Sequence, residues 1–133
     1  MAICLFCKTE FEAKRNTSRK YCNNHCQGQH TAQKVVLSWL ANPCPETFYT
    51  KGNIVRGSIR TALIQKAGCK CTRCGWGEMH HSAKLPALEI EHINGNWLDC
   101  SPSNIDIICP NCHSLTDTYK ARNLGKGRDY RRK

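Results

Sequence analysis

The chain has 133 residues, which is enough for one domain or for two very small ones. It carries 20 Lys and Arg against 10 Asp and Glu, and this basic balance favours a polyanionic partner, with nucleic acid before an anionic membrane surface. No apolar stretch approaches the length of a membrane span, and a signal-peptide core is missing from the opening MAICLFCKTEFEAKR, so we expect a cytoplasmic protein without a membrane partner.

Eleven cysteines in so short a chain indicate either disulfides or metal sites. In a cytoplasmic protein, closely spaced cysteine pairs bind metal more often than they bind each other. Two residues between paired cysteines allow a tight turn that aims both thiolates at one ion, and four thiolates complete a tetrahedral zinc site. The spacing therefore predicts two structural zinc ions, which would also compensate for apolar segments that are short and few.

The first zinc site is predicted in an N-terminal finger, within residues 1–41. Its ligands would be Cys4, Cys7, Cys22 and Cys26. His25 is an alternative to Cys26, because Cys22-x2-His25 would also form a metal-binding turn. The central loop of the finger is basic and suits contact with DNA phosphates through Lys14, Arg15, Arg19 and Lys20. The finger could instead serve only as a stability module or a protein contact.

Two short helices are predicted between the zinc sites. The first runs from Thr31 to Ala41 and is stopped by Asn42-Pro43. Residues 42–57 contain prolines and glycines and are interpreted as a linker. The second helix begins at Ser58, a plausible N-cap, and ends near Ala67. The rest of the chain divides into a module at 58–119 and a basic tail at 120–133.

The second zinc site is predicted to enclose a hairpin. Two strands, 85–92 and 104–109, are joined by a loop that is rich in turn residues, and a helix follows the last cysteine pair. The ligands would be Cys71, Cys74, Cys109 and Cys112. Three cysteines remain outside both sets and are interpreted as small, half-buried apolar residues: Cys44, Cys69 and Cys100.

Polar residues stand at three defined points of this hairpin and helix. His92 ends the first strand, Asn104 opens the second, and His113 directly follows a zinc ligand. A metal-dependent nuclease needs a general base near neutral pH, a hard divalent cation at the scissile phosphate, and a polar group that orients the base. Glu91 and His113 could hold the cation, and Asn104 could orient His92 or join the coordination. Taken singly, each residue is more simply interpreted as an ordinary polar residue of a zinc-stapled hairpin.

Together these residues resemble a known family. The stretches LEIEHINGN and SPSNIDIICPNCHSLTDT resemble the HNH endonucleases, and CKCTRCG resembles the turn before the hairpin in their four-cysteine branch. In the family's order, the preceding acid, first His, Asn and last His match Glu91, His92, Asn104 and His113. The resemblance covers residues 58–128 and implies a ββα-metal finger, treble-clef-like. Many members have Asp or His where this chain has Glu91, which leaves the preferred metal open.

The resemblance implies hydrolysis of a DNA phosphodiester bond. His92 would take a proton from water, Glu91 and His113 would hold Mg²⁺, Mn²⁺ or Ni²⁺, and Asn104 would fix His92. The expected protein is a small zinc-stabilised α+β nuclease module with an N-terminal finger. It would act on double-stranded DNA as a monomer or homodimer, as a nicking or homing-type enzyme of a phage or mobile element in the cytoplasm of a bacterial host. The alternative is a non-catalytic zinc DNA-binding protein, which would need only the cysteines.

The basic tail is expected to add salt-sensitive, non-specific affinity for DNA. Its predicted DNA-contacting residues are Lys120, Arg122, Lys126 and Arg128.

Overall fold

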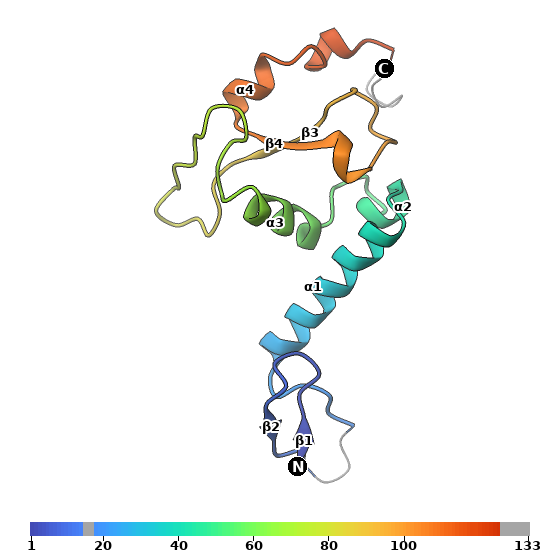
Figure 1. Ribbon diagram of the computed structural model, residues 1–133, viewed down its shortest axis with the longest axis vertical. Coiled ribbons are helices and arrows are strands. Elements are labelled where there is room, and N and C mark those ends of the chain that lie inside the picture. The colour runs from blue at the N-terminus through green and yellow to red at the C-terminus, as the bar shows by residue number, and fades with distance from the viewer. Residues whose placement is uncertain (15–17, 126–133) are drawn as a thin grey trace.

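A computed structural model describes residues 1–14 and 18–125. The predicted DNA contacts Arg15, Lys126 and Arg128 therefore lie outside the described residues. The chain forms a small finger and a larger module joined by a long helix (Figure 1). In chain order the elements are β1 (Ala2–Ile3), β2 (Glu10–Phe11), α1 (Asn24–Ala41), α2 (Pro45–Phe48), α3 (Gly57–Lys66), β3 (Glu89–His92), η1 (Pro102–Asn104), β4 (Ile105–Ile108), α4 (Pro110–Ser114) and η2 (Lys120–Asn123).

Helix α1 is longer than the sequence predicted, because it begins at Asn24 and not at Thr31. The side chain of Asn23 accepts a hydrogen bond of 2.8 Å from the backbone N–H of Cys26, which is the usual way in which an asparagine starts a helix. The first turn of α1 therefore carries one of the predicted zinc ligands. The helix has 18 residues, so it is about 27 Å long at a rise of about 1.5 Å per residue, and the finger lies at its far end (Figure 1).

Residues 42–57, interpreted from the sequence as a linker, contain a helix and part of the core. Pro45 occupies the first turn of α2, where its missing N–H leaves no hydrogen bond unmade. Phe48 and Tyr49 follow and are 0% and 2% exposed. Helix α3 then begins at Gly57, one residue before the predicted N-cap. The segment is thus packed structure, while the domain boundaries themselves stay a prediction.

The core has two clusters of buried residues beneath the hairpin. The first gathers Trp39, Phe48, Tyr49, Ile59 and Cys100, and the second gathers Ile64, Cys71, Leu88, Ile107, Ile108 and Cys109. Leu63 and Ile90 pack against both clusters, which makes the two continuous. The indole N–H of Trp39 also donates a hydrogen bond of 2.8 Å to the backbone carbonyl of Cys100. This bond fastens α1 to the loop that follows β3.

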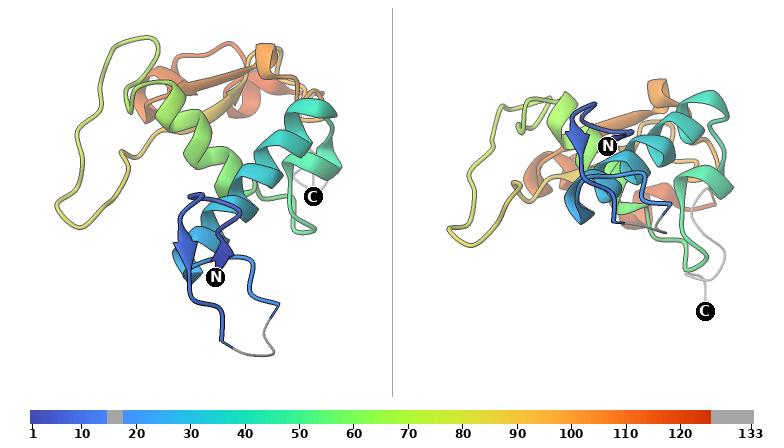
Figure 2. Two further views of the ribbon diagram at one scale, coloured as in Figure 1. Left: turned by 60° about the horizontal axis from the view of Figure 1, so that its bottom comes forward. Right: turned by 90° about the horizontal axis from the view of Figure 1, so that it is seen from below.

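Strands β3 and β4 form an antiparallel pair in which Glu89 lies opposite Ile108 and His92 lies opposite Ile105. Both strands are shorter than predicted, and Asn104 is the last residue of η1, directly before β4. The segment between α3 and β3 is an extended loop that lies away from α1 and α2 (Figure 2). Within the described part of the chain, no helix is both long and apolar enough to cross a membrane.

Candidate active site and metal centres

Two groups of four cysteines each converge on a point. Within each group the sulfur atoms all lie within 4.8 Å of one another, and the groups are Cys4, Cys7, Cys22, Cys26 and Cys71, Cys74, Cys109, Cys112. Individual sulfur pairs are separated by 3.4 to 3.6 Å. A tetrahedral zinc ion with Zn–S bonds of about 2.3 Å requires sulfur atoms about 3.8 Å apart. Both groups therefore have a geometry that could hold zinc, and all eleven cysteines are free of disulfides.

The structure also distinguishes the alternative ligands. Cys26 completes the N-terminal group, whereas His25 is exposed to solvent. In the second group the four predicted cysteines come together, and Cys69, interpreted as a half-buried apolar residue, lies outside it. Cys26 takes this position and His25 does not because α1 starts at the Asn23 cap, which places Cys26 on the buried side of the first turn.

The thiols within each group differ widely in pKa. Burial is the largest influence on the pKa of Cys71 and raises it, but backbone hydrogen bonds at Cys74, Cys109 and Arg73 together lower the pKa to about 6. Hydrogen bonds with the Cys109 and Cys74 side chains, followed by burial, raise the pKa of Cys112 to about 12. One thiolate forms readily and its neighbour then resists ionisation. A divalent cation is what would allow all four to ionise together.

The N-terminal group likewise contains one thiol with a lowered pKa and one with a raised pKa. Burial raises the pKa of Cys4, but backbone hydrogen bonds at Cys22, Cys7 and Phe6 outweigh it and lower the pKa to about 6. Burial, followed by contacts with the other three thiols, raises the pKa of Cys26 to about 12.

Strand β3 and helix α4 bring the predicted cation ligands together. Glu91 is 4% exposed, and its Oε2 lies 2.8 Å from Nε2 of His113. The hydroxyl of Thr118 donates a hydrogen bond to the other oxygen of Glu91. The carboxylate of Glu89 contacts Nδ1 of the same histidine. His113 thus lies between two carboxylates, one on each ring nitrogen.

Glu89 and Thr118 also contact these residues of the candidate site, and neither was predicted from the sequence. Alternation along a strand puts residues i and i+2 on one face, so the spacing of Glu89 and Glu91 was a signal that could have identified the first. Thr118 carries no such signal, because its contact depends on how the chain returns after α4.

His92 contacts a different set of side chains. Its Nε2 lies 2.9 Å from the hydroxyl of Tyr49, and the rings of Phe48 and His92 meet edge to face with centroids 5.9 Å apart. Both aromatic residues come from the segment interpreted as a linker. No local pattern in the sequence pointed to this contact, since Tyr49 is 43 positions away from the histidine.

Asn104 holds the loop after His92. Its side-chain amide donates to Oδ1 of Asn94 at 3.0 Å and to the carbonyl of Asp99 at 2.9 Å, and its Oδ1 accepts from the backbone N–H of Asn94 at 3.0 Å. Both amide protons are therefore used. All three bonds join Asn104 to the loop, and its role in orienting His92 or joining the coordination stays a prediction.

The predicted DNA contacts differ in their surroundings. Lys14, Lys20 and Lys120 are exposed. Arg19 donates to the carbonyl of Cys22 at 2.9 Å. Arg122 donates through Nε to the carbonyl of Thr116 at 2.9 Å and through Nη2 to that of Ser114, so this guanidinium ties η2 to the end of α4 and the residues that follow it.

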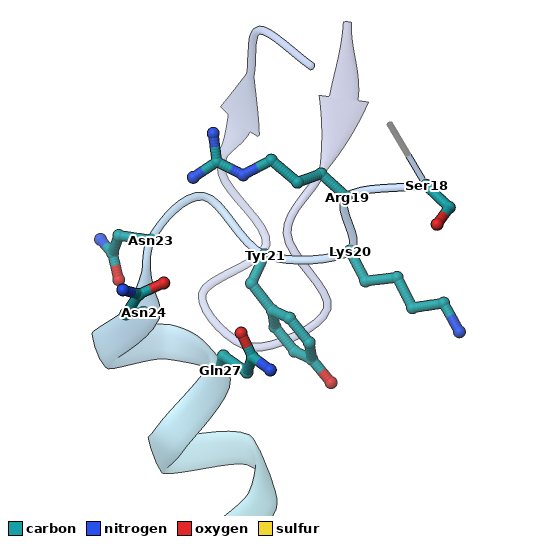
Figure 3. A pocket seen from close by; sticks show the side chains of 7 residues that line it. All are labelled: Ser18, Arg19, Lys20, Tyr21, Asn23, Asn24 and Gln27. Atoms are coloured by element: carbon teal, nitrogen blue, oxygen red, sulfur yellow. The ribbon is translucent and has the colours of Figure 1, made fainter. Parts of the chain in front are cut away.

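A surface pocket of about 190 Å³ lies where the finger meets α1 (Figure 3). Arg19, Lys20 and Tyr21 line it from the loop before the helix, and Asn24 and Gln27 line it from the first turns of α1. The pocket carries two cationic side chains, several amides and no carboxylate.

These observations define a small α+β protein with two four-cysteine groups and an acidic, histidine-containing site beside one of them. Over 111 residues the chain is 31% identical to the H-N-H endonuclease F-TflIV of Escherichia phage T5. This alignment covers 83% of the chain and 41% of the relative, so the chain spans less than half the length of the curated protein that it matches. No family model and no solved structure matches the chain. The resemblance to the HNH endonucleases is confirmed, and the chain is a distant homologue of such a protein.

Proposed function

We propose that the chain is a metal-dependent DNA endonuclease of the HNH type, with β3, β4 and α4 as its ββα-metal module. The observation that carries the proposal is the distance of 2.8 Å between Oε2 of Glu91 and Nε2 of His113. His113 directly follows Cys112 of the second four-cysteine group, and Glu91 directly precedes His92. A protein that needed only a zinc-stapled scaffold would have no use for a buried carboxylate against an imidazole. The name of the phage T5 relative supports the same class of activity.

Glu91 and His113 would hold the catalytic divalent cation, Mg²⁺, Mn²⁺ or Ni²⁺. A carboxylate oxygen and an imidazole nitrogen are both accepted ligands of Mn²⁺ and Ni²⁺, and the carboxylate suits Mg²⁺. When bound, this cation would stabilise negative charge on the phosphate and the leaving 3′ oxygen. Glu89 on the other ring nitrogen of His113 would orient the imidazole, as carboxylates commonly do for metal-bound histidines.

His92 would act as the general base that takes a proton from the attacking water. Asn104 would support it by holding the loop from Asn94 to Asp99 in place. The two four-cysteine groups would hold structural zinc. Because Cys112 and His113 are adjacent, the second zinc would also set the position of a cation ligand.

Double-stranded DNA would bind along the basic surface of the chain. The pocket of Arg19 and Lys20 would receive backbone phosphates, and the basic residues after α4 would add salt-sensitive affinity. One such site cuts one strand, so a monomer would nick and double-strand cutting would need a homodimer or two events. A phage or mobile-element origin, homing-type, with action in the bacterial cytoplasm, agrees with the phage relative.

The test is conversion of supercoiled plasmid to open-circle and linear forms with added Mg²⁺ or Mn²⁺. We expect His92→Ala to slow cleavage by a factor on the order of 10² to 10⁴, as for loss of a general base, while DNA binding persists. His81→Ala is the matched control, because His81 is exposed and lies outside the site. Equal cleavage by wild type and His92→Ala would contradict the role of His92. DNA binding without cleavage on plasmid, phage and bacterial genomic DNA would favour the non-catalytic zinc DNA-binding protein.

A further inference from the structure

A tyrosine outside the ββα unit contacts His92. Tyr49 follows α2, is 2% exposed, and belongs to the core cluster that contains Trp39 and Phe48. Its hydroxyl lies 2.9 Å from Nε2 of His92 and donates a second hydrogen bond of 2.9 Å to the backbone carbonyl of Trp97. The phenol therefore links the proposed general base to the loop after β3.

One arrangement of protons satisfies both of these contacts of the phenol. A phenol has one proton, and a backbone carbonyl can only accept. With the phenol proton on the carbonyl of Trp97, the oxygen of Tyr49 is left to accept at His92, an arrangement that places the hydrogen of the imidazole on Nε2. A neutral imidazole has only one N–H, and the lone pair is then on Nδ1.

We propose that Tyr49 is a positioning residue that keeps His92 in the Nε2–H tautomer, with Nδ1 as the atom that accepts the proton of the attacking water. This inference rests on the proposed function, in which His92 is the general base. The O–H bond of water breaks, and the proton forms a bond to Nδ1. The hydroxide oxygen forms a bond to phosphorus while the bond from phosphorus to the 3′ oxygen breaks, and the 3′ oxygen leaves and takes a proton from solvent water. The imidazolium that results keeps its Nε2–H bond to Tyr49, so the phenol does not have to reorient during the step.

The surrounding packing keeps the imidazole in this position. Tyr49 stacks on His92 with an angle of 25° between the rings, and Phe48 meets the same ring at 81°. The rings of Tyr49 and Trp97 are 5.7 Å apart, which holds the carbonyl partner close to the phenol.

The same chain of contacts connects Asn104 to His92 through the loop and Tyr49. Its amide holds the loop from Asn94 to Asp99, the loop presents the carbonyl of Trp97, and that carbonyl orients Tyr49. Asn104 thus acts on His92 through two intermediaries.

The first experiment measures the tautomer itself. Two-bond ¹⁵N–¹H correlations of the histidine rings are recorded on the full zinc-loaded chain, about two pH units above the ordinary histidine pKa of about 6.5. We expect Nε2–H for His92 in the wild type and a mixture of tautomers in Tyr49→Phe. Tyr21→Phe is the matched control, since it removes a hydroxyl bonded to another histidine, His30, and should leave the tautomer of His92 unchanged. An Nδ1–H tautomer in the wild type would overturn the inference even if Tyr49→Phe fails to fold.

The second experiment measures plasmid cleavage in single turnover with saturating protein. We expect Tyr49→Phe to lower the rate roughly 10- to 100-fold, the usual effect of losing a group that orients a site residue, with DNA affinity unchanged. A folded Tyr49→Phe chain that cuts at the wild-type rate would overturn the proposal. If the wild type shows the Nε2–H tautomer but cuts no DNA, the proposed function is wrong and Tyr49 has no role in catalysis. The hydrogen bonds that link His92, Tyr49 and Trp97 would still be confirmed by that result.

Discussion

The two four-cysteine groups have the same geometry but very different neighbours. The N-terminal group lies in the finger at the far end of α1 (Figure 1), and a basic pocket lies where this finger meets the helix (Figure 3). The second group lies in the core of the hairpin module, where Cys71 and Cys109 are buried and Cys112 is followed at once by His113. A metal in the first position can organise only the finger and the start of α1. A metal in the second position holds the proposed active site together. Loss of a ligand should therefore affect cleavage differently in the two four-cysteine groups.

The largest difference is expected for loss of one ligand from each group. Cys112→Ser should lower the zinc content to one ion per chain and abolish cleavage, because apparent binding energies of structural zinc are on the order of 10 kcal/mol and the position of α4 depends on this one. Cys22→Ser should also lose one zinc ion but should retain the cleavage rate at saturating DNA. Metal analysis and plasmid cleavage measure both effects.

Cys69→Ser serves as the control for this comparison, because Cys69 lies outside both groups. Cleavage that persists in a sample shown to be free of zinc would refute the structural role of the second ion. Loss of cleavage in Cys22→Ser at saturating DNA would show that the finger and the module do not act separately.

A second, smaller contrast separates the two carboxylates on β3. Glu91→Gln removes the negative charge of a proposed cation ligand and should lower cleavage at limiting Mn²⁺ by about 100-fold or more. Glu89→Gln changes only the partner on the other ring nitrogen of His113 and should cost roughly 10-fold. Cleavage rates over a range of Mn²⁺ concentrations measure both. Equal losses in the two variants would mean that Glu89 is itself a ligand.

The sequence predicted those features that depend on neighbours along the chain. Cysteine spacing identified both groups of ligands, and the alternation and turn residues around His92 identified the hairpin and the helix after it. The contacts of Tyr49 could not be predicted, because they arise when a segment far along the chain packs against β3. The prolines of that segment suggested a linker, although Pro45 stands where prolines commonly begin a helix. The position of Asn104 at the start of the second strand could be predicted, but its partners could not, since the hydrogen bonds that an amide makes depend on the folded loop.

The smallest expected effect concerns the finger and its pocket. Lys20 is exposed and lines the pocket, so Lys20→Gln should weaken DNA binding a few-fold and reduce the slope of log affinity against log salt by about 1, as expected for one lost phosphate contact. The cleavage rate at saturating DNA should not change. Lys34→Gln is the charge-matched control, because Lys34 is exposed on α1 outside the pocket. Equal changes in salt slope for the two variants would mean that overall charge, and not the pocket, attracts the DNA. An unchanged slope for Lys20→Gln alone would leave the finger as a stability module, and the difference between the two zinc sites would then lie entirely in the chemistry beside Cys112.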